Sequence, residues 1–172
     1  MVNSGGPPPA TFETTDEADC ERANAGTLQS TLRLIRAALP HLREGDAPAI
    51  VINLSSSVRE PLPGLTTSNV LRPGLAGLIK NLAFEIVPIR INGVAPGRFD
   101  TARVEQLDGK RAEATGRSIE EVRQEARARI PLGRYGDTAE MGRVASFLLS
   151  PAASYVTGAI VPVDGGLVRA LP

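Results

Sequence analysis

Three consecutive serines, Ser55, Ser56 and Ser57, directly follow the apolar run Ala49–Leu54. A serine hydroxyl can donate a hydrogen bond that orients a polar substrate, and it can equally terminate a strand by bonding nearby backbone groups. Because an aliphatic alcohol is a weak acid, proton transfer through it normally needs a separate base. The serine cluster therefore indicates either a substrate-orienting role or the end of a strand.

The residue types that commonly supply a base, a nucleophile or a metal ligand are scarce. His41 is the only histidine and Cys20 is the only cysteine. These counts exclude His-dependent triads, multi-histidine metal sites and an intrachain disulfide. We accordingly predict no metal site.

Charged residues are balanced in number and interleaved in sequence. Lys+Arg and Asp+Glu both number 19, so no net field attracts the chain to nucleic acid or to an acidic membrane surface. The arginines between positions 111 and 134 alternate with glutamates such as Glu120 and Glu121. Such a pattern is typical of a solvated, self-neutralising helix face, which we favour over a phosphate site.

The length of 172 residues corresponds to one domain, predicted here to span 1–172. Prolines and glycines over Gly5–Pro9 predict an irregular segment within residues 1–12. The N-terminus lacks the basic start and apolar stretch of a signal peptide, and no run of apolar residues reaches membrane-spanning length. A cytoplasmic location without membrane or nucleic-acid partners is expected.

Apolar periodicity predicts two amphipathic helices, one following a capped, acidic start at Thr15–Glu17 and one beginning near Arg72. Their stripes comprise Leu28, Leu32, Ile35, Leu39 and Leu42 in the first helix, and Leu75, Leu78, Ile79, Leu82 and Ile86 in the second. Each stripe places apolar residues on one face, which predicts packing against a sheet.

Short apolar runs predict buried strands over residues 49–54, 89–94 and 159–163. Ser118 and Glu121 form a capping box, and Asp137 with Glu140 repeats an acidic helix start. Helices that alternate with strands in this way predict an α/β fold with a parallel sheet.

Several motifs occur in a characteristic order and at characteristic intervals. They are Asn3-Ser4-Gly5, the run from Ala49 to Ser57, Ile91 to Gly97, Tyr155 to Gly158, and Val163 to Gly166. Together they closely resemble the C-terminal part of the short-chain dehydrogenases/reductases. The resemblance implies a truncated Rossmann-like doubly wound parallel sheet that lacks the first βαβαβ half and its Gly-rich turn. Either the chain is a real truncation or its true start lies upstream.

The resemblance also places a catalytic window. Family members use a tyrosine followed four residues later by a lysine; the corresponding positions here are Ser68 and Arg72. The upstream family serine corresponds to Ser55 by spacing or to Ser56 by its place after the strand, and the family's helix asparagine aligns with Thr27. A guanidinium is always charged and cannot relay protons, so the usual tyrosine mechanism does not carry over.

Cofactor-binding residues follow from the same resemblance. Asn3 lies in the family's Asn-Ala-Gly turn, and Pro96-Gly97 lies where the backbone bends around the nicotinamide. The amide of Phe99 and the hydroxyl of Thr101 fall where family members bind the carboxamide or the pyrophosphate. The implied cofactor is NAD or NADP.

Two functions remain open on the sequence. The first is an NAD(P)-dependent oxidoreductase acting on a small carbonyl or alcohol, weak or inactive as an isolated chain. The second is a non-catalytic binding or assembly module, in which Ile50, Val51 and Ile52 lie near an uncovered sheet edge. In the family, the helices of residues 28–42 and 72–86 pack against a second subunit, which implies a homo-oligomer or a mixed oligomer with a full-length relative.

Overall fold

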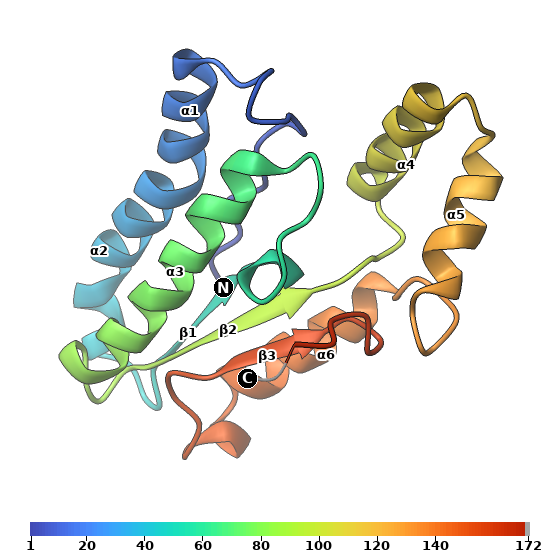
Figure 1. Cartoon of the computed structure of the whole chain (residues 1–172). Helices are drawn as coiled ribbons and strands as arrows, with labels where there is room; N and C mark the ends of the chain where they lie inside the picture. The colour runs from blue at the N-terminus through green and yellow to red at the C-terminus, as the bar shows by residue number, and fades with distance from the viewer. Residues whose placement is uncertain (171–172) are drawn as a thin grey trace.

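A computed structural model describes residues 1–170 and contains a parallel three-stranded sheet in the order β1-β2-β3 (Figure 1). The strands are β1 (Ala49–Asn53), β2 (Arg90–Pro96) and β3 (Ile160–Val163). In β1, Ile50 and Ile52 face one hydrophobic cluster, whereas Val51 faces the other. Burial of both faces explains why the strand is almost entirely apolar, and the predicted parallel α/β sheet is confirmed.

One face of the sheet is covered by a long N-terminal helix and by α3 (Thr66–Glu85). The long helix is continuous through α1 (Glu17–Asn24), a π-helical segment over Ala25–Gln29, and α2 (Ser30–Arg43). Asp16 caps its first turn through a reciprocal capping box with Asp19. The predicted apolar stripe supplies this layer, with Ile35 from α2 and Leu75 and Ile79 from α3 in the buried cluster.

The predicted start of α3 near Arg72 is wrong, because the helix begins at Thr66 and contains Pro73. Proline removes an intrahelical hydrogen bond and normally interrupts a helix. Here the preceding turns are anchored from outside: Ser68 and Arg72 are buried, and the Asn69 side chain bonds the backbone N–H and C=O of Leu62. Tertiary contacts therefore extend the helix through the proline.

The other face of the sheet is covered by α6 (Thr138–Leu149), which packs Ala145 and Leu148 against Val51 and Val94. Its predicted acidic start is a full capping box between Asp137 and Glu140. A short 3₁₀ turn over 151–153 then leads into β3.

Two buried polar side chains of β2 tie the following segments to the sheet. Arg90 donates to the carbonyl oxygens of Leu148 and Ala153 at 2.8 and 2.9 Å, which satisfies carbonyls at the end of α6. Asn92 is fully buried, donates to the Val156 carbonyl and accepts from the Ala159 amide. These bonds hold the segment before β3 against β2.

Beyond the carboxyl end of β2, α4 (Ala102–Thr115) and α5 (Ile119–Ala128) stand side by side (Figure 1). The capping box of Ser118 and Glu121 begins α5 as predicted. The sequence reading did not identify α4 as a separate helix. Thr101 caps its start, and Gly116 ends it with a φ of 63°.

The outer edge of β1 is partly covered, which corrects the expectation of an open edge at Ile50–Ile52. The Val2 amide donates to the Val51 carbonyl at 2.7 Å, and the Asn53 amide donates to the Val2 carbonyl at 2.9 Å. Val2 thus extends the sheet by one parallel bridge. Among residues 1–170, no helix combines the length and apolar character that a membrane span requires.

Candidate functional site

The carboxyl ends of β1 and β2 bring most of the predicted site residues to one edge of the sheet. Ser55 and the 3₁₀ turn over Ser56–Val58 follow β1, while Gly97, Phe99 and Thr101 follow β2. In open parallel sheets, ligands bind in the crevice outside the carboxyl ends of the strands. The fold therefore places these residues where an α/β sheet normally binds a ligand.

Arg72 connects three parts of this edge. Its guanidinium donates to the carbonyl oxygens of Asn53 and Gly5, so it joins the end of β1 to the N-terminal segment. The Asn53 side chain in turn donates to Oδ1 of Asn3 at 3.0 Å. Burial lowers the pKa of the Arg72 guanidinium, yet an arginine remains charged at any physiological pH. Arg72 thus fixes a positive charge at the predicted catalytic window.

The serines have different local roles. Oγ of Ser55 accepts from the Ser57 amide at 3.1 Å and caps the short turn, which matches the strand-terminating interpretation. Ser56 and Ser57 are buried. Ser68 is also buried and lies one helical turn before Arg72, on the same face of α3.

Unused hydrogen-bonding capacity is concentrated at this end of β1. Within residues 1–170, four buried side-chain atoms lack a hydrogen-bond partner, and three of them are Oδ1 of Asn53, Oγ of Ser57 and Nε of Arg72. Buried polar groups are otherwise nearly always paired, so each exception needs an explanation. A polar ligand at this edge is one such explanation.

The residues predicted to hold the cofactor also serve the fold. A Cβ on Gly97 would lie 2.7 Å from Cβ of Asp164, so glycine is required for the close approach of the chain after β3. The Phe99 ring lies against Gly136 in the same way. Oγ1 of Thr101 accepts from the Val104 amide at 3.3 Å as the cap of α4. In the described part of the chain, the Phe99 amide has no hydrogen-bond acceptor.

Thr27, aligned with the family's helix asparagine, is buried in the π-helical segment. Its carbonyl oxygen accepts from the Thr31 hydroxyl at 2.8 Å. Single π-turns within α-helices are frequent at functional sites, but here the carbonyl at the turn already has a side-chain partner.

A network that the sequence reading missed joins α4, α5 and the segment after β2. Asp108 is fully buried, pairs with Arg98, accepts from the Tyr135 hydroxyl at 2.9 Å and lies 3.6 Å from Nε of Arg123. No signal in the sequence indicated this network, because the burial of Asp108 becomes apparent only once α4 is folded against its neighbours.

Neither tyrosine belongs to the predicted catalytic window at Ser68 and Arg72. Burial raises the pKa of Tyr135, and its hydroxyl is committed to Asp108. Tyr155 is fully exposed and lies between α6 and β3 in the chain. In the described residues, no group of three His, Cys, Asp or Glu side chains is arranged to hold a metal ion.

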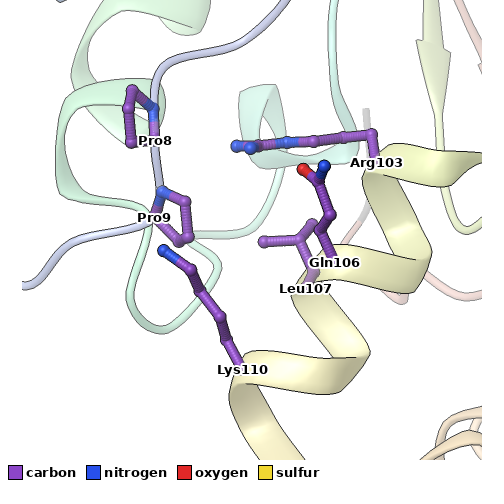
Figure 2. Close-up of a pocket in the computed structure, with 6 residues that line it drawn as sticks. All are labelled: Pro8, Pro9, Arg103, Gln106, Leu107 and Lys110. Carbon is purple, nitrogen blue, oxygen red and sulfur yellow. The ribbon is translucent and has the colours of Figure 1, made fainter.

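A pocket of about 250 Å³ lies between the N-terminal segment and α4 (Figure 2). Its lining residues are Pro8, Pro9, Arg103, Gln106, Leu107 and Lys110. A second, wider pocket of about 530 Å³ lies at the carboxyl end of β3, between Phe99 and Asp164.

Comparison with known proteins gives consistent relatives. The family model described as Enoyl-(Acyl carrier protein) reductase matches residues 1–168. The 3-oxoacyl-[acyl-carrier-protein] reductase FabG of Thermotoga maritima is 39% identical over 121 residues, covering 69% of this chain and 45% of the relative. The chain spans about half the length of the curated relatives it matches.

Solved structures agree with this relationship. An NADPH-bound short-chain oxidoreductase from Pseudomonas aeruginosa PAO1 that contains an atypical catalytic center has a TM-score of 0.83 and 30% identity, over 97% of this chain and 64% of that one. The 3-ketoacyl-(acyl-carrier-protein) reductase from Brucella melitensis, complexed with NADH, has a TM-score of 0.79 and 26% identity, over 94% and 63%.

Proposed function

The chain belongs to the short-chain dehydrogenase/reductase family of oxidoreductases, and from this premise we propose that it is an NAD(P)-dependent enzyme acting on a small carbonyl or alcohol substrate. The observation that carries the proposal is the end of β1. There the buried Ser57 and Arg72 retain polar atoms without partners, next to the buried Ser68.

The proposed cofactor is NAD or NADP, with its nicotinamide end at the carboxyl edge of the sheet. Relatives solved with NADH and with NADPH support the cofactor class. The residues assigned to it are Asn3, Pro96, Gly97, Phe99 and Thr101. They fit the group because the Phe99 amide is unpartnered among the described residues, and the Thr101 hydroxyl, which caps α4, donates only a long bond of 3.5 Å to the Phe99 carbonyl. When bound, nicotinamide supplies or accepts the hydride.

The protein's part in the reaction is to orient the substrate oxygen. Carbonyl reduction adds hydride to carbon and a proton to oxygen; the hydride comes from the bound nicotinamide and the proton from solvent water. We assign the hydrogen bonds that orient the substrate oxygen to Ser68 and to Ser55 or Ser56. Arg72 stabilises negative charge that develops on that oxygen and positions the N-terminal segment through Gly5. Because a serine hydroxyl is far less acidic than a tyrosine activated by lysine, activity is expected to be weak.

The whole-protein activity is part of the proposal, since the chain spans about half the length of its curated relatives. In our proposal the sheet of Val2, β1, β2 and β3 corresponds to the second half of a doubly wound sheet. The Gly-rich turn that binds the pyrophosphate in such folds has no counterpart in this sequence.

Calorimetry with NADH and NADPH, followed by cofactor oxidation assays on a panel of ketones and aldehydes, tests the proposal. Saturable binding with slow turnover is expected, and Ser68→Ala should lower kcat while leaving the cofactor Kd unchanged. Thr66→Ala is a matched control, because it removes a hydroxyl from the first turn of the same helix. Absence of cofactor binding by a cooperatively folded sample would contradict the enzyme proposal.

An assembly role is the second candidate, and exposed apolar side chains favour it. Leu34 of α2 and Val70 and Phe84 of α3 are exposed, with Phe84 84% accessible. Large apolar groups of this kind often mark a surface that another protein covers. We propose that a second copy or a full-length relative binds there. Sedimentation velocity of the wild type and of Phe84→Glu tests this, with a shift to monomer expected in the variant.

A further inference from the structure

The pocket beside α4 has an unusual balance of charge. Three cations lie on α4 after its cap: Arg103, Lys110 and Arg111. Arg111 pairs with Glu125 at 2.8 Å. Arg103 and Lys110 form no ion pair with any described residue, and both line the pocket. No carboxylate belongs to its lining. Both unneutralised cations of the helix therefore face one cavity.

The rest of the lining is apolar or uncharged. Leu107, Pro8 and Pro9 supply apolar walls, and Gln106 adds an amide. Positions 103, 106, 107 and 110 recur at helical spacing, so one face of α4 provides the cations, the amide and the leucine together. Figure 2 shows the Arg103 side chain extended across the pocket and the Lys110 amine directed toward Pro9. Such a lining is complementary to a small anion attached to a short apolar group.

The pocket adjoins the site assigned above through the N-terminal segment. Arg103 donates to the carbonyl oxygen of Pro7, while Arg72 donates to that of Gly5, two residues earlier. The two arginines thus hold the same short segment from α4 and from α3. A ligand between Arg103 and Lys110 would lie next to the segment that Arg72 positions.

We propose that this pocket binds the anionic group, a carboxylate or a phosphate, of the carbonyl substrate. Arg103 and Lys110 supply charge-assisted hydrogen bonds to the anion, and Leu107 with the two prolines contacts the carbon chain that leads to the carbonyl. The substrate class is a short oxo acid or phosphorylated carbonyl compound. This assignment rests on the proposed oxidoreductase function.

Ligand-detected and amide NMR titrations of the full chain with 4-oxopentanoate and with its methyl ester test the proposal without requiring turnover. The acid should bind at least tenfold more tightly than the uncharged ester. Lys110→Gln should weaken binding of the acid about tenfold, as loss of one charge-assisted hydrogen bond implies. Lys110 is exposed and makes no bond to the fold in the described residues, so this variant should remain folded.

Arg111→Gln is the matched control, because it removes the same charge from the same helix outside the pocket. It should change the Kd of the acid less than twofold. Equal binding of acid and ester, no binding of either, or an equal loss in Arg111→Gln would overturn the proposal. Parallel titration with 2-oxopropylphosphonate separates the two anion classes, since the tighter ligand identifies carboxylate or phosphate.

The outcome is distinguishable from failure of the oxidoreductase proposal. NADPH titration of the same sample reports on that function independently. Binding of the acid that depends on Lys110 without any binding of NADPH would retain the anion pocket and reject the enzyme. Binding of NADPH with no preference for the acid would retain the enzyme and reject the anionic substrate.

Discussion

The end of β1 and the α4–α5 pair differ in how far their buried polar groups are satisfied. At the end of β1, Asn53, Ser57 and Arg72 each keep a buried atom without a partner. Between α4 and α5, the fully buried Asp108 has a charge partner in Arg98 and a hydrogen bond from Tyr135, and only Nε of Arg123, 3.6 Å from Asp108, lacks a hydrogen bond. A largely satisfied network stabilises the fold by itself, whereas several unpaired atoms together leave bonding capacity for a ligand. The contrast separates a structural region from a candidate binding region.

The largest expected effect comes from breaking the satisfied network. Asp108→Asn removes the charge of a fully buried side chain and leaves Arg98 without its charge partner. The variant should lower the free energy of unfolding by about 3 kcal/mol. Glu113→Gln, on an exposed position of the same helix, should change it by less than about 0.5 kcal/mol. Urea unfolding of both variants measures the difference. Equal effects would mean that the Asp108 network contributes nothing specific.

A steric test concerns the junction between the two regions. A Cβ on Gly136 would lie 2.6 Å from Cε1 of Phe99, so Gly136→Ala should destabilise the protein by about 1–3 kcal/mol through overpacking. Gly142 in α6 has open space around it, and Gly142→Ala should stabilise by about 0.5–1 kcal/mol through helix propensity. Thermal unfolding of the pair should give shifts of opposite sign; shifts of the same sign would contradict the packing described for Phe99.

Two serines of the cluster, Ser55 and Ser57, sharpen the contrast within the candidate site. Ser55→Ala removes the hydroxyl that accepts a hydrogen bond from the Ser57 amide, and should lower the free energy of unfolding by about 0.5–1 kcal/mol. Ser57→Ala removes a hydroxyl without a partner, so the free energy of unfolding should stay within about 0.5 kcal/mol of the wild type or rise. Denaturant titrations of both variants decide between them. A larger loss for Ser57→Ala would show that its hydroxyl is already satisfied.

The smallest effect is expected at an exposed pair, as a reference for the buried one. Arg134 bonds both carboxylate oxygens of Glu140 at 2.7 Å and holds the pKa of Glu140 at about 2. Because the folded pKa lies below the ordinary value of 4.5, this stabilisation is present above pH 4.5 and declines as the pH falls toward 2. Glu140→Gln should therefore flatten the fall in Tm across that interval. If the slope of Tm against pH is unchanged in Glu140→Gln, Glu140 does not contribute to the pH dependence of stability.

Local signals in the sequence predicted the elements well. The capping boxes at Ser118 and Asp137 begin helices as expected, and the apolar runs form the three strands. These features depend on neighbouring residues, which a single sequence contains. The early start of α3 was missed because bonds from Asn69 to Leu62 and the burial of Ser68 outweigh the local effect of Pro73.

The site was less predictable, since its contacts join distant segments. The family resemblance predicted a shared role for Ser68 and Arg72, and the structure places both on α3, although the predicted helix began only near Arg72. Nothing in the sequence indicates that Arg72 bonds Gly5, 67 residues away. Asp108 and Lys110 lie in a stretch that was not predicted as a helix, and nothing local distinguishes them from other charged residues. Only the fold shows that one is buried in a network and that the other lines a pocket.

The most direct test of the contrast is an amide NMR titration of the folded chain with NADPH. A ligand at the candidate site should shift the amides of Ser57, Phe99 and Thr101 in a saturable manner, while the amides of Asp108 and Tyr135 stay in place. Saturable shifts confined to the α4–α5 network, or no shifts at all from a folded sample, would contradict the assignment of the end of β1 as the binding region.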